Sequence, residues 1–145
     1  MTHTIKHLFH INAKRSDVYK AITSIDGLSN WWTVDTKGDP SVGGTISFRF
    51  AENGGPDMKV VEMEPDEGVT WKCIESPHGW FGHTFRFILD DNAGKTRVRF
   101  THEGWEEADD GFGICTFAWG RYMESLRQLL QTGRGEAFGS PGYRI

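Results

Sequence analysis

Apolar residues recur with a helical period between residues 112 and 132, near the C-terminus. At 3.6 residues per turn, one broad stripe contains Phe112, Cys115, Ala118, Trp119, Tyr122, Met123, Leu126, Leu129 and Leu130. Asp109 or Asp110 can cap the start of this segment, and Gly133 follows its end. The pattern therefore predicts a helix about 30 Å long, which needs a long apolar surface to lie on.

Upstream of this segment the period is mostly two, which is typical of strands with one buried face. Strands are predicted at residues 3–11, 45–50, 58–64, 69–74, 83–89 and 96–102. The register of the third strand stays open, because Val60 and Val61 are adjacent and point to opposite faces. Between the first two strands, Ser16 is expected to cap a helix that Gly27 ends, and residues 28–32 to add one further turn.

This order of elements predicts an α+β fold. We expect a curved six-stranded antiparallel sheet, two short helices after the first strand, and the long C-terminal helix packed on the concave face. The first strand must pair at an edge or across the curl. Residues 1–132 are expected to form one domain and residues 133–145 a Gly-rich C-terminal tail.

Composition narrows the classes of partner. The net charge is −4 with no Lys/Arg run, which argues against nucleic acid. No apolar run is long enough to insert into a membrane, and the first residues do not resemble a signal peptide, so a cytoplasmic location is expected. The sequence leaves monomer or homodimer open and indicates no metal and no cofactor.

Aromatic residues make up 13% of the chain, which suits either a thick core or a ligand cavity. The candidate ligand-binding residues are Trp31, Trp32, Phe48, Trp71, His83, Phe85, Phe100, His102, Trp105, Trp119 and Tyr122. Close packing is the alternative interpretation, because protein interiors leave few voids. Aromatic residues predicted in loops, and so expected near a mouth, are Trp31, Trp32, Trp80, Phe81 and Trp105.

Two histidines stand out within this set. By strand parity His102 faces the helix, where it can orient a ligand carbonyl or hydroxyl, act as a general base, or be satisfied by a backbone carbonyl or Tyr122. His83 has the same parity on the neighbouring strand, so the two are expected to be cross-strand neighbours at the cavity rim. No third or fourth metal ligand is apparent beside them.

Other polar groups suggest no chemistry. The acidic run Glu103, Glu106, Glu107, Asp109 and Asp110 is interpreted as a solvated loop that favours the helix N-terminus. His3, His7 and His10 are interpreted as ordinary strand residues. Neither a nucleophile motif nor a phosphate-binding loop is present, so catalysis has no direct support.

Several local motifs, in this order, resemble the START-like superfamily, also called SRPBCC, which shares its helix-grip fold with the birch pollen allergen. Within it the chain resembles the family of the activator of 90 kDa heat shock protein ATPase homologue. The matching segments are residues 16–22, the Leu28 to Trp32 turn, the Gly-Gly segment at 42–46, the hairpin 61–71, and Thr101-His102-Glu103-Gly104-Trp105. The resemblance implies an apolar cavity between sheet and last helix, used across the superfamily for lipids, sterols and polyketides.

Three functions follow as hypotheses. The first is binding of a small hydrophobic or aromatic molecule between the sheet and the C-terminal helix. The second is a cyclase-like enzyme with His102 or His83 as acid/base. The third is a protein-interaction or co-chaperone role, through the exposed sheet face or the tail.

Overall fold

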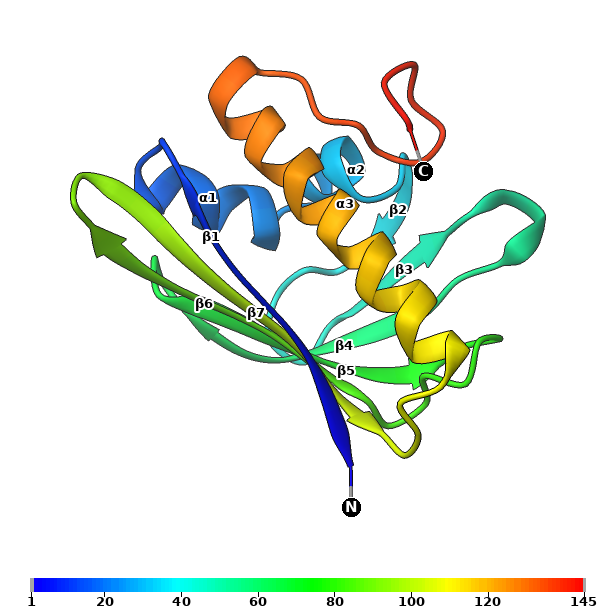
Figure 1. The fold of residues 1–145 in the computed structure, drawn as a ribbon. Helices are drawn as coiled ribbons and strands as arrows, with labels where there is room; N and C mark the ends of the chain where they lie inside the picture. Colours follow the sequence, from blue (N-terminus) through cyan, green and yellow to red (C-terminus); the bar gives the residue numbers. More distant parts are fainter. Residues whose placement is uncertain (1, 145) are drawn as a thin grey trace.

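The computed structural model describes residues 2–144 and has the form of a curved sheet with its helices on one face (Figure 1). The elements are, in order, β1 (His3–Ile11), α1 (Arg15–Thr23), α2 (Ile25–Trp31), β2 (Asp35–Gly38), β3 (Thr45–Arg49), a 3-10 turn (Ala51–Asn53), β4 (Asp57–Glu64), β5 (Gly68–Glu75), β6 (Thr84–Asn92), β7 (Lys95–Trp105) and α3 (Asp110–Thr132). The α+β helix-grip arrangement predicted from the sequence is confirmed.

Within the described residues the sheet has seven antiparallel strands in the order β1-β7-β6-β5-β4-β3-β2. The prediction of six strands was wrong by one, because it missed β2. This strand is only four residues long and polar, and only Thr36 is buried, so it carries no apolar alternation. Its pairing with β3 places it at the sheet edge, and no local pattern specifies that pairing.

The first strand lies at the opposite edge, paired with β7. A bulge between Val60 and Glu62 settles the register that the sequence left open in β4. Met58 and Val60 are buried, whereas Val61 is exposed.

The two short helices differ locally from expectation. Ser16 does not cap α1, which begins at Arg15 and has no side-chain cap. Instead Ser24 caps α2, accepting a hydrogen bond from the Gly27 N–H at 3.0 Å. Gly27 lies inside α2 rather than ending a helix. A Cβ atom there would stand 2.5 Å from the Ala21 carbonyl oxygen, so glycine permits the close approach of α2 to α1.

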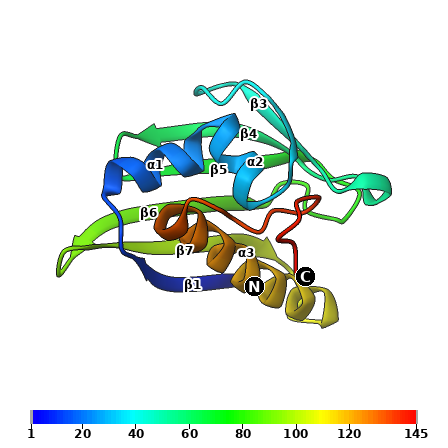
Figure 2. The same cartoon turned by 90° about the horizontal axis from the view of Figure 1, so that it is seen from above.

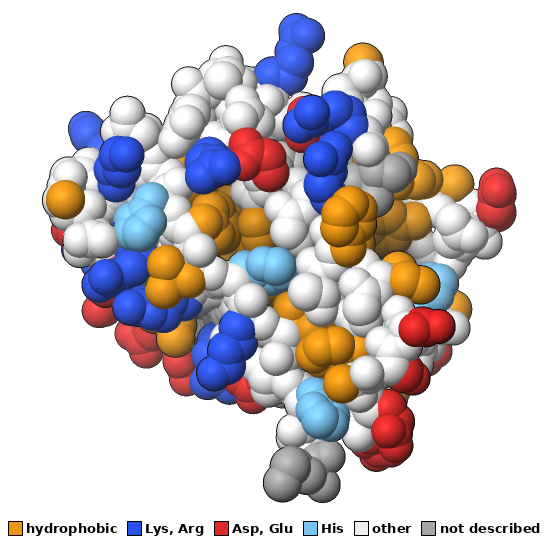
Figure 3. Space-filling model, viewed as in Figure 1, with side chains coloured by type: hydrophobic (Ala, Val, Ile, Leu, Met, Phe, Trp, Pro, Cys, Tyr) orange, Lys and Arg blue, Asp and Glu red, His pale blue; other side chains and the backbone are white. Residues whose placement is uncertain are grey.

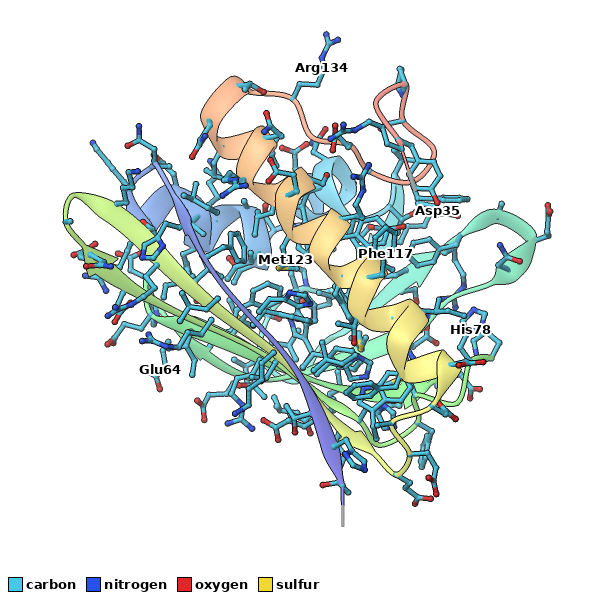
Figure 4. All side chains as sticks on the ribbon, in the orientation of Figure 1. Asp35, Glu64, His78, Phe117, Met123 and Arg134 are labelled. Atoms are coloured by element: carbon cyan, nitrogen blue, oxygen red, sulfur yellow. The ribbon has the colours of Figure 1, made fainter. Side chains whose placement is uncertain are left out.

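The long helix α3 begins and ends as its sequence predicts. The Asp109 side chain accepts from the Phe112 N–H at 3.1 Å, and Gly133 closes the helix with φ 85°. Figure 2 shows α3 lying across the same face of the sheet as α1 and α2. Met123, on the side of α3 that faces the sheet, is buried (Figure 4). In the part of the chain that is described, no helix is long and apolar enough to cross a membrane.

The C-terminal segment packs against the domain. The Ser125 hydroxyl donates to the Trp31 carbonyl at 2.8 Å and accepts from the Glu136 N–H at 2.6 Å. Phe138 forms a parallel bridge with Thr33. Ser125 therefore joins α3, the end of α2 and the C-terminal segment.

Candidate functional site

The middle of the space between sheet and α3 is occupied by five rings, which we call the aromatic centre: Trp32, Phe48, Trp71, Phe100 and Trp119. Ring centroids are 4.3 Å apart for Trp32 and Phe48, 4.8 Å for Trp32 and Trp119, and 4.5 Å for Phe100 and Trp119. None of the five side chains is more than 2% exposed. These distances are those of packed aromatic pairs, so the rings fill this part of the expected cavity themselves.

Three other candidate residues are also buried. Trp31 lies in α2, and its indole N–H donates to the Ala21 carbonyl at 2.9 Å. The expectation that Trp31 and Trp32 lie in loops near a mouth was wrong, because α2 and its C-cap turn both rings inward. Tyr122 faces Trp119 and Trp32, and burial raises the pKa of its hydroxyl. Phe85 lies under the His102 ring, with centroids 4.0 Å apart.

A chain of hydrogen bonds leads outward from the aromatic centre. Trp119 Nε1 donates to His102 Nδ1 at 3.1 Å, and His102 Nε2 lies 2.9 Å from His83 Nδ1. The predicted proximity of the two histidines is therefore confirmed, although in the register His102 faces Phe85, two residues along from His83. His102 is satisfied by Trp119 and His83 rather than by Tyr122 or a backbone carbonyl.

The chemistry of these groups fixes where the hydrogens lie. An indole nitrogen can only donate, so His102 Nδ1 must be unprotonated and its Nε2 must carry the hydrogen. His102 therefore donates to His83 Nδ1, and neutral His83 carries its hydrogen on Nε2. Protonating either ring would set two N–H groups against each other, so the geometry favours a neutral pair.

The pKa shifts agree with this assignment. Burial, with a smaller contribution from the repulsion that a protonated His83 would exert, lowers the pKa of His102 to about 2. Burial also lowers the pKa of His83, against an opposing influence from the Glu106 carboxylate. His102 is fully buried with both ring nitrogens engaged, so a ligand can reach only His83.

His83, the outer end of this series of hydrogen bonds, lines a cavity of about 550 Å³ between the loop after β5 and the connection from β7 to α3. We call it the rim pocket; it is lined by His78, Gly79, Phe81, Gly82, His83, Gly104, Trp105, Glu106, Glu107, Asp109 and Gly111. Figure 4 places His78 beside the N-terminal end of α3. Acidic side chains gather near the same end in the space-filling view (Figure 3).

Two residues pack around the histidine pair in ways that sequence reasoning missed. Gly104 has φ +112°, and a Cβ atom there would stand 2.9 Å from His83 Cδ2, so glycine makes room for the imidazole. Trp80, in the loop after β5, lies edge-on to His102 at 4.9 Å and stacks on Trp119 at 6.1 Å. A loop residue has no periodicity that would predict such contacts. The acidic run, interpreted as a solvated loop, supplies Glu106, Glu107 and Asp109 to the pocket wall.

No three His, Cys, Asp or Glu side chains converge as a metal ion would require, within residues 2–144. His3, His7 and His10 are spread along β1 and each faces a different partner residue of β7.

Comparison with known proteins identifies the family. Residues 12–131 match the profile described as Activator of Hsp90 ATPase homolog 1-like protein. The chain belongs to this family. The START-like resemblance inferred from the sequence motifs is thereby confirmed. No curated protein matches the chain.

Solved structures of the same fold include the Aha1 dimer from Colwellia psychrerythraea, which is 37% identical with a TM-score of 0.84. That alignment covers 92% of this chain and 99% of the Colwellia chain. SSP2350 from Staphylococcus saprophyticus is 16% identical with a TM-score of 0.76, covering 93% of this chain and 97% of its own. MLL2253 from Mesorhizobium loti is 23% identical with a TM-score of 0.74, covering 88% and 96%. The last two comparisons show the fold alone.

Proposed function

We propose that this member of the Activator of Hsp90 ATPase homolog 1-like family binds a small, flat, largely apolar molecule at the rim pocket. The observation that carries the proposal is an open cavity of about 550 Å³ at the end of a buried hydrogen-bonded chain. Its volume is typical of small-molecule sites, and Phe81 and Trp105 supply apolar surface to a wall that also carries Glu106, Glu107 and Asp109. The fold of the family supports the same conclusion, since START-like domains typically bind hydrophobic ligands. A cytoplasmic location remains a prediction.

The proposal moves the expected site from the middle of the sheet to its rim. Trp105 and His83 remain its proposed contacts, together with Phe81, which is 74% exposed and lines the same pocket. The residues of the aromatic centre then support the floor of the site instead of touching the ligand. An apolar ligand gains by covering Phe81 and Trp105, because their exposed apolar surface leaves water.

The chain offers a matched pair of variants for testing the location. Gly111 lines the rim pocket in the first turn of α3, and a Cβ atom there meets only Asp109 Oδ1 at 3.4 Å. Gly113, two residues on, is outside the pocket and has nothing within 4 Å. Gly111→Trp should therefore obstruct the pocket, whereas Gly113→Trp places the same side chain in solvent.

We would titrate a panel of neutral naphthalene derivatives, including 2-acetylnaphthalene, into the three proteins and follow the Trp105 indole N–H by NMR. The wild type and Gly113→Trp should bind alike, and Gly111→Trp should bind about tenfold more weakly or worse, because the new ring fills the cavity. Absence of binding to the wild type, or equal binding to all three proteins, would reject the rim pocket as the site.

A second candidate function is self-association through the outer face of α3. Ile114 and Phe117 are 70% and 69% exposed on that face, one helical turn apart. The similar Colwellia protein is described as a dimer. Exposed apolar side chains of this size on one helix face are common at interfaces between protein chains.

Sedimentation at several protein concentrations tests this second candidate. Phe117→Ser should weaken association, while Val42→Ser, at an exposed apolar position outside α3, should leave it unchanged. A wild-type protein that stays monomeric at high concentration would reject the candidate.

A further inference from the structure

The rim pocket contains a donor whose hydrogen position is set from inside the protein. His83 Nδ1 is engaged by His102, so its hydrogen lies on Nε2, and no described residue accepts a hydrogen bond from that nitrogen. Resting on the proposed ligand binding at the rim pocket, we propose that the pocket selects neutral aromatic molecules with an oxygen acceptor, such as ketones. In this arrangement the His83 Nε2–H donates to the ligand oxygen.

The buried chain makes this donor stronger than an isolated histidine. Trp119 donates into His102, which strengthens the His102 Nε2–H, and that group in turn donates into His83. Hydrogen bonds in such series polarise one another, most effectively away from water. A donor at the end of the series therefore favours a good acceptor over an apolar group of the same shape.

The position of His83 is fixed before a ligand arrives. The backbone N–H of His83 donates to the Trp80 carbonyl at 2.9 Å, and the backbone carbonyl of His83 accepts from the Cys73 N–H at 2.9 Å. The imidazole lies against Gly104, and Trp105 flanks it with ring centroids 5.1 Å apart. Little conformational entropy is then lost when the hydrogen bond to a ligand forms.

Charge at the rim pocket selects against anions. Glu106, Glu107 and Asp109 line it, none of its described lining residues is a lysine or arginine, and the geometry holds His83 neutral, so the three carboxylates outnumber the one remaining imidazole, that of His78. The indole N–H of Trp105 is buried without a partner among residues 2–144. The fixed donor on His83 and the acidic wall together favour a neutral acceptor.

The test compares two ligands of the same shape, 2-acetylnaphthalene and 2-isopropenylnaphthalene, in which a methylene group replaces the carbonyl oxygen. The measured quantity is the ratio of their Kd values in the wild type and in His83→Phe. The preference for the ketone over the alkene, expressed as this ratio, should be about fivefold larger in the wild type than in His83→Phe. This is the size of effect expected for one hydrogen bond. The anion 2-naphthoate should bind the wild type at least about tenfold more weakly than the ketone.

The outcomes separate the two proposals. If both neutral ligands bind, Gly111→Trp blocks both, and the ratio is the same in wild type and His83→Phe, the site is correct and the donor role of His83 is overturned. Tighter binding of 2-naphthoate than of the ketone overturns the selection for neutral ligands. If no naphthalene derivative binds, the proposed function and this inference fall together.

One measurement needs neither a ligand nor a variant that folds. Long-range ¹H–¹⁵N spectra of the wild-type imidazoles report which ring nitrogens carry hydrogen. His83 and His102 should both be neutral at pH 7 with the hydrogen on Nε2. A hydrogen on His83 Nδ1 would overturn the inference directly.

Discussion

The aromatic centre and the rim pocket are joined through His102 and His83 but differ in packing and exposure. In the centre, Trp32, Trp71 and Trp119 are at most 2% exposed, and each ring touches others. At the rim, Phe81 is 74% exposed, and acidic side chains share the cavity wall with Trp105. An aromatic-rich sequence is thus divided between a packed interior and an open edge. The richness in aromatic residues alone does not locate a ligand site.

The chain from Trp119 through His102 to His83 connects the two regions. Its inner end is buried among rings and its outer end reaches the rim pocket. The donor Trp119, at the buried end, fixes which ring nitrogens carry hydrogen. His83, at the open end, is left with its Nε2–H available to a ligand. Substitutions should therefore cost stability at the inner end and ligand affinity at the outer end.

The largest expected effect is that of Trp119→Ala. Loss of a fully packed aromatic side chain should lower the free energy of unfolding by about 3–5 kcal/mol, and it also removes the donor to His102 Nδ1. Urea denaturation measures this loss. A cost below about 1.5 kcal/mol would mean that the centre is not close-packed, and the contrast with the rim would fail.

Acidification should have the next largest effect. The pKa of His102 is about 2 in the folded protein and about 6.5 in the unfolded chain. The neutral buried ring therefore contributes its full stability above about pH 6.5, and this contribution is lost as the pH falls toward about 2. Between pH 7 and pH 5, His102 alone should therefore remove about 2 kcal/mol of stability.

The control for this prediction is His102→Phe, which removes the titrating group from the buried chain. The variant should lose about 2 kcal/mol less than the wild type over the same pH range, while the lowered pKa values of His7 and His83 add a background loss to both proteins. Equal losses in the two proteins would show that His102 is not held neutral.

Phe81→Ala should have the smallest effect on folding. The ring is mostly in solvent, so the free energy of unfolding should change by less than about 0.5 kcal/mol. Because Phe81 lines the rim pocket, the same variant should weaken binding of 2-acetylnaphthalene. A stability loss comparable to that of Trp119→Ala would place Phe81 in the packed interior and erase the distinction between the regions.

Much of the fold could be predicted from local pattern. The stripe on α3, its cap at Asp109 and its end at Gly133 were all readable because each depends on neighbours within a few residues. The β2 strand was not, since four polar residues become a strand only by pairing with β3. Ser16 does not cap α1, because the helix already begins one residue earlier, at Arg15, and Ser24 caps the separate helix α2.

The candidate site was predicted in part. Strand parity brought His83 and His102 together correctly. It did not indicate that the Trp119 indole would donate to His102 Nδ1, or that Trp80 would contact both His102 and Trp119. These contacts join a strand, a helix and a loop, and no spacing along the chain encodes them.

The sequence by itself determined which faces of the strands and of α3 are apolar, because side-chain periodicity follows directly from backbone geometry. It also carried the motifs that identify the family. Only the tertiary structure decided that the central rings fill their own space while the opening lies at His83 and Trp105. The reason is that cavities arise from how side chains distant in sequence fit together, and that fit depends on volumes and angles that no single segment contains.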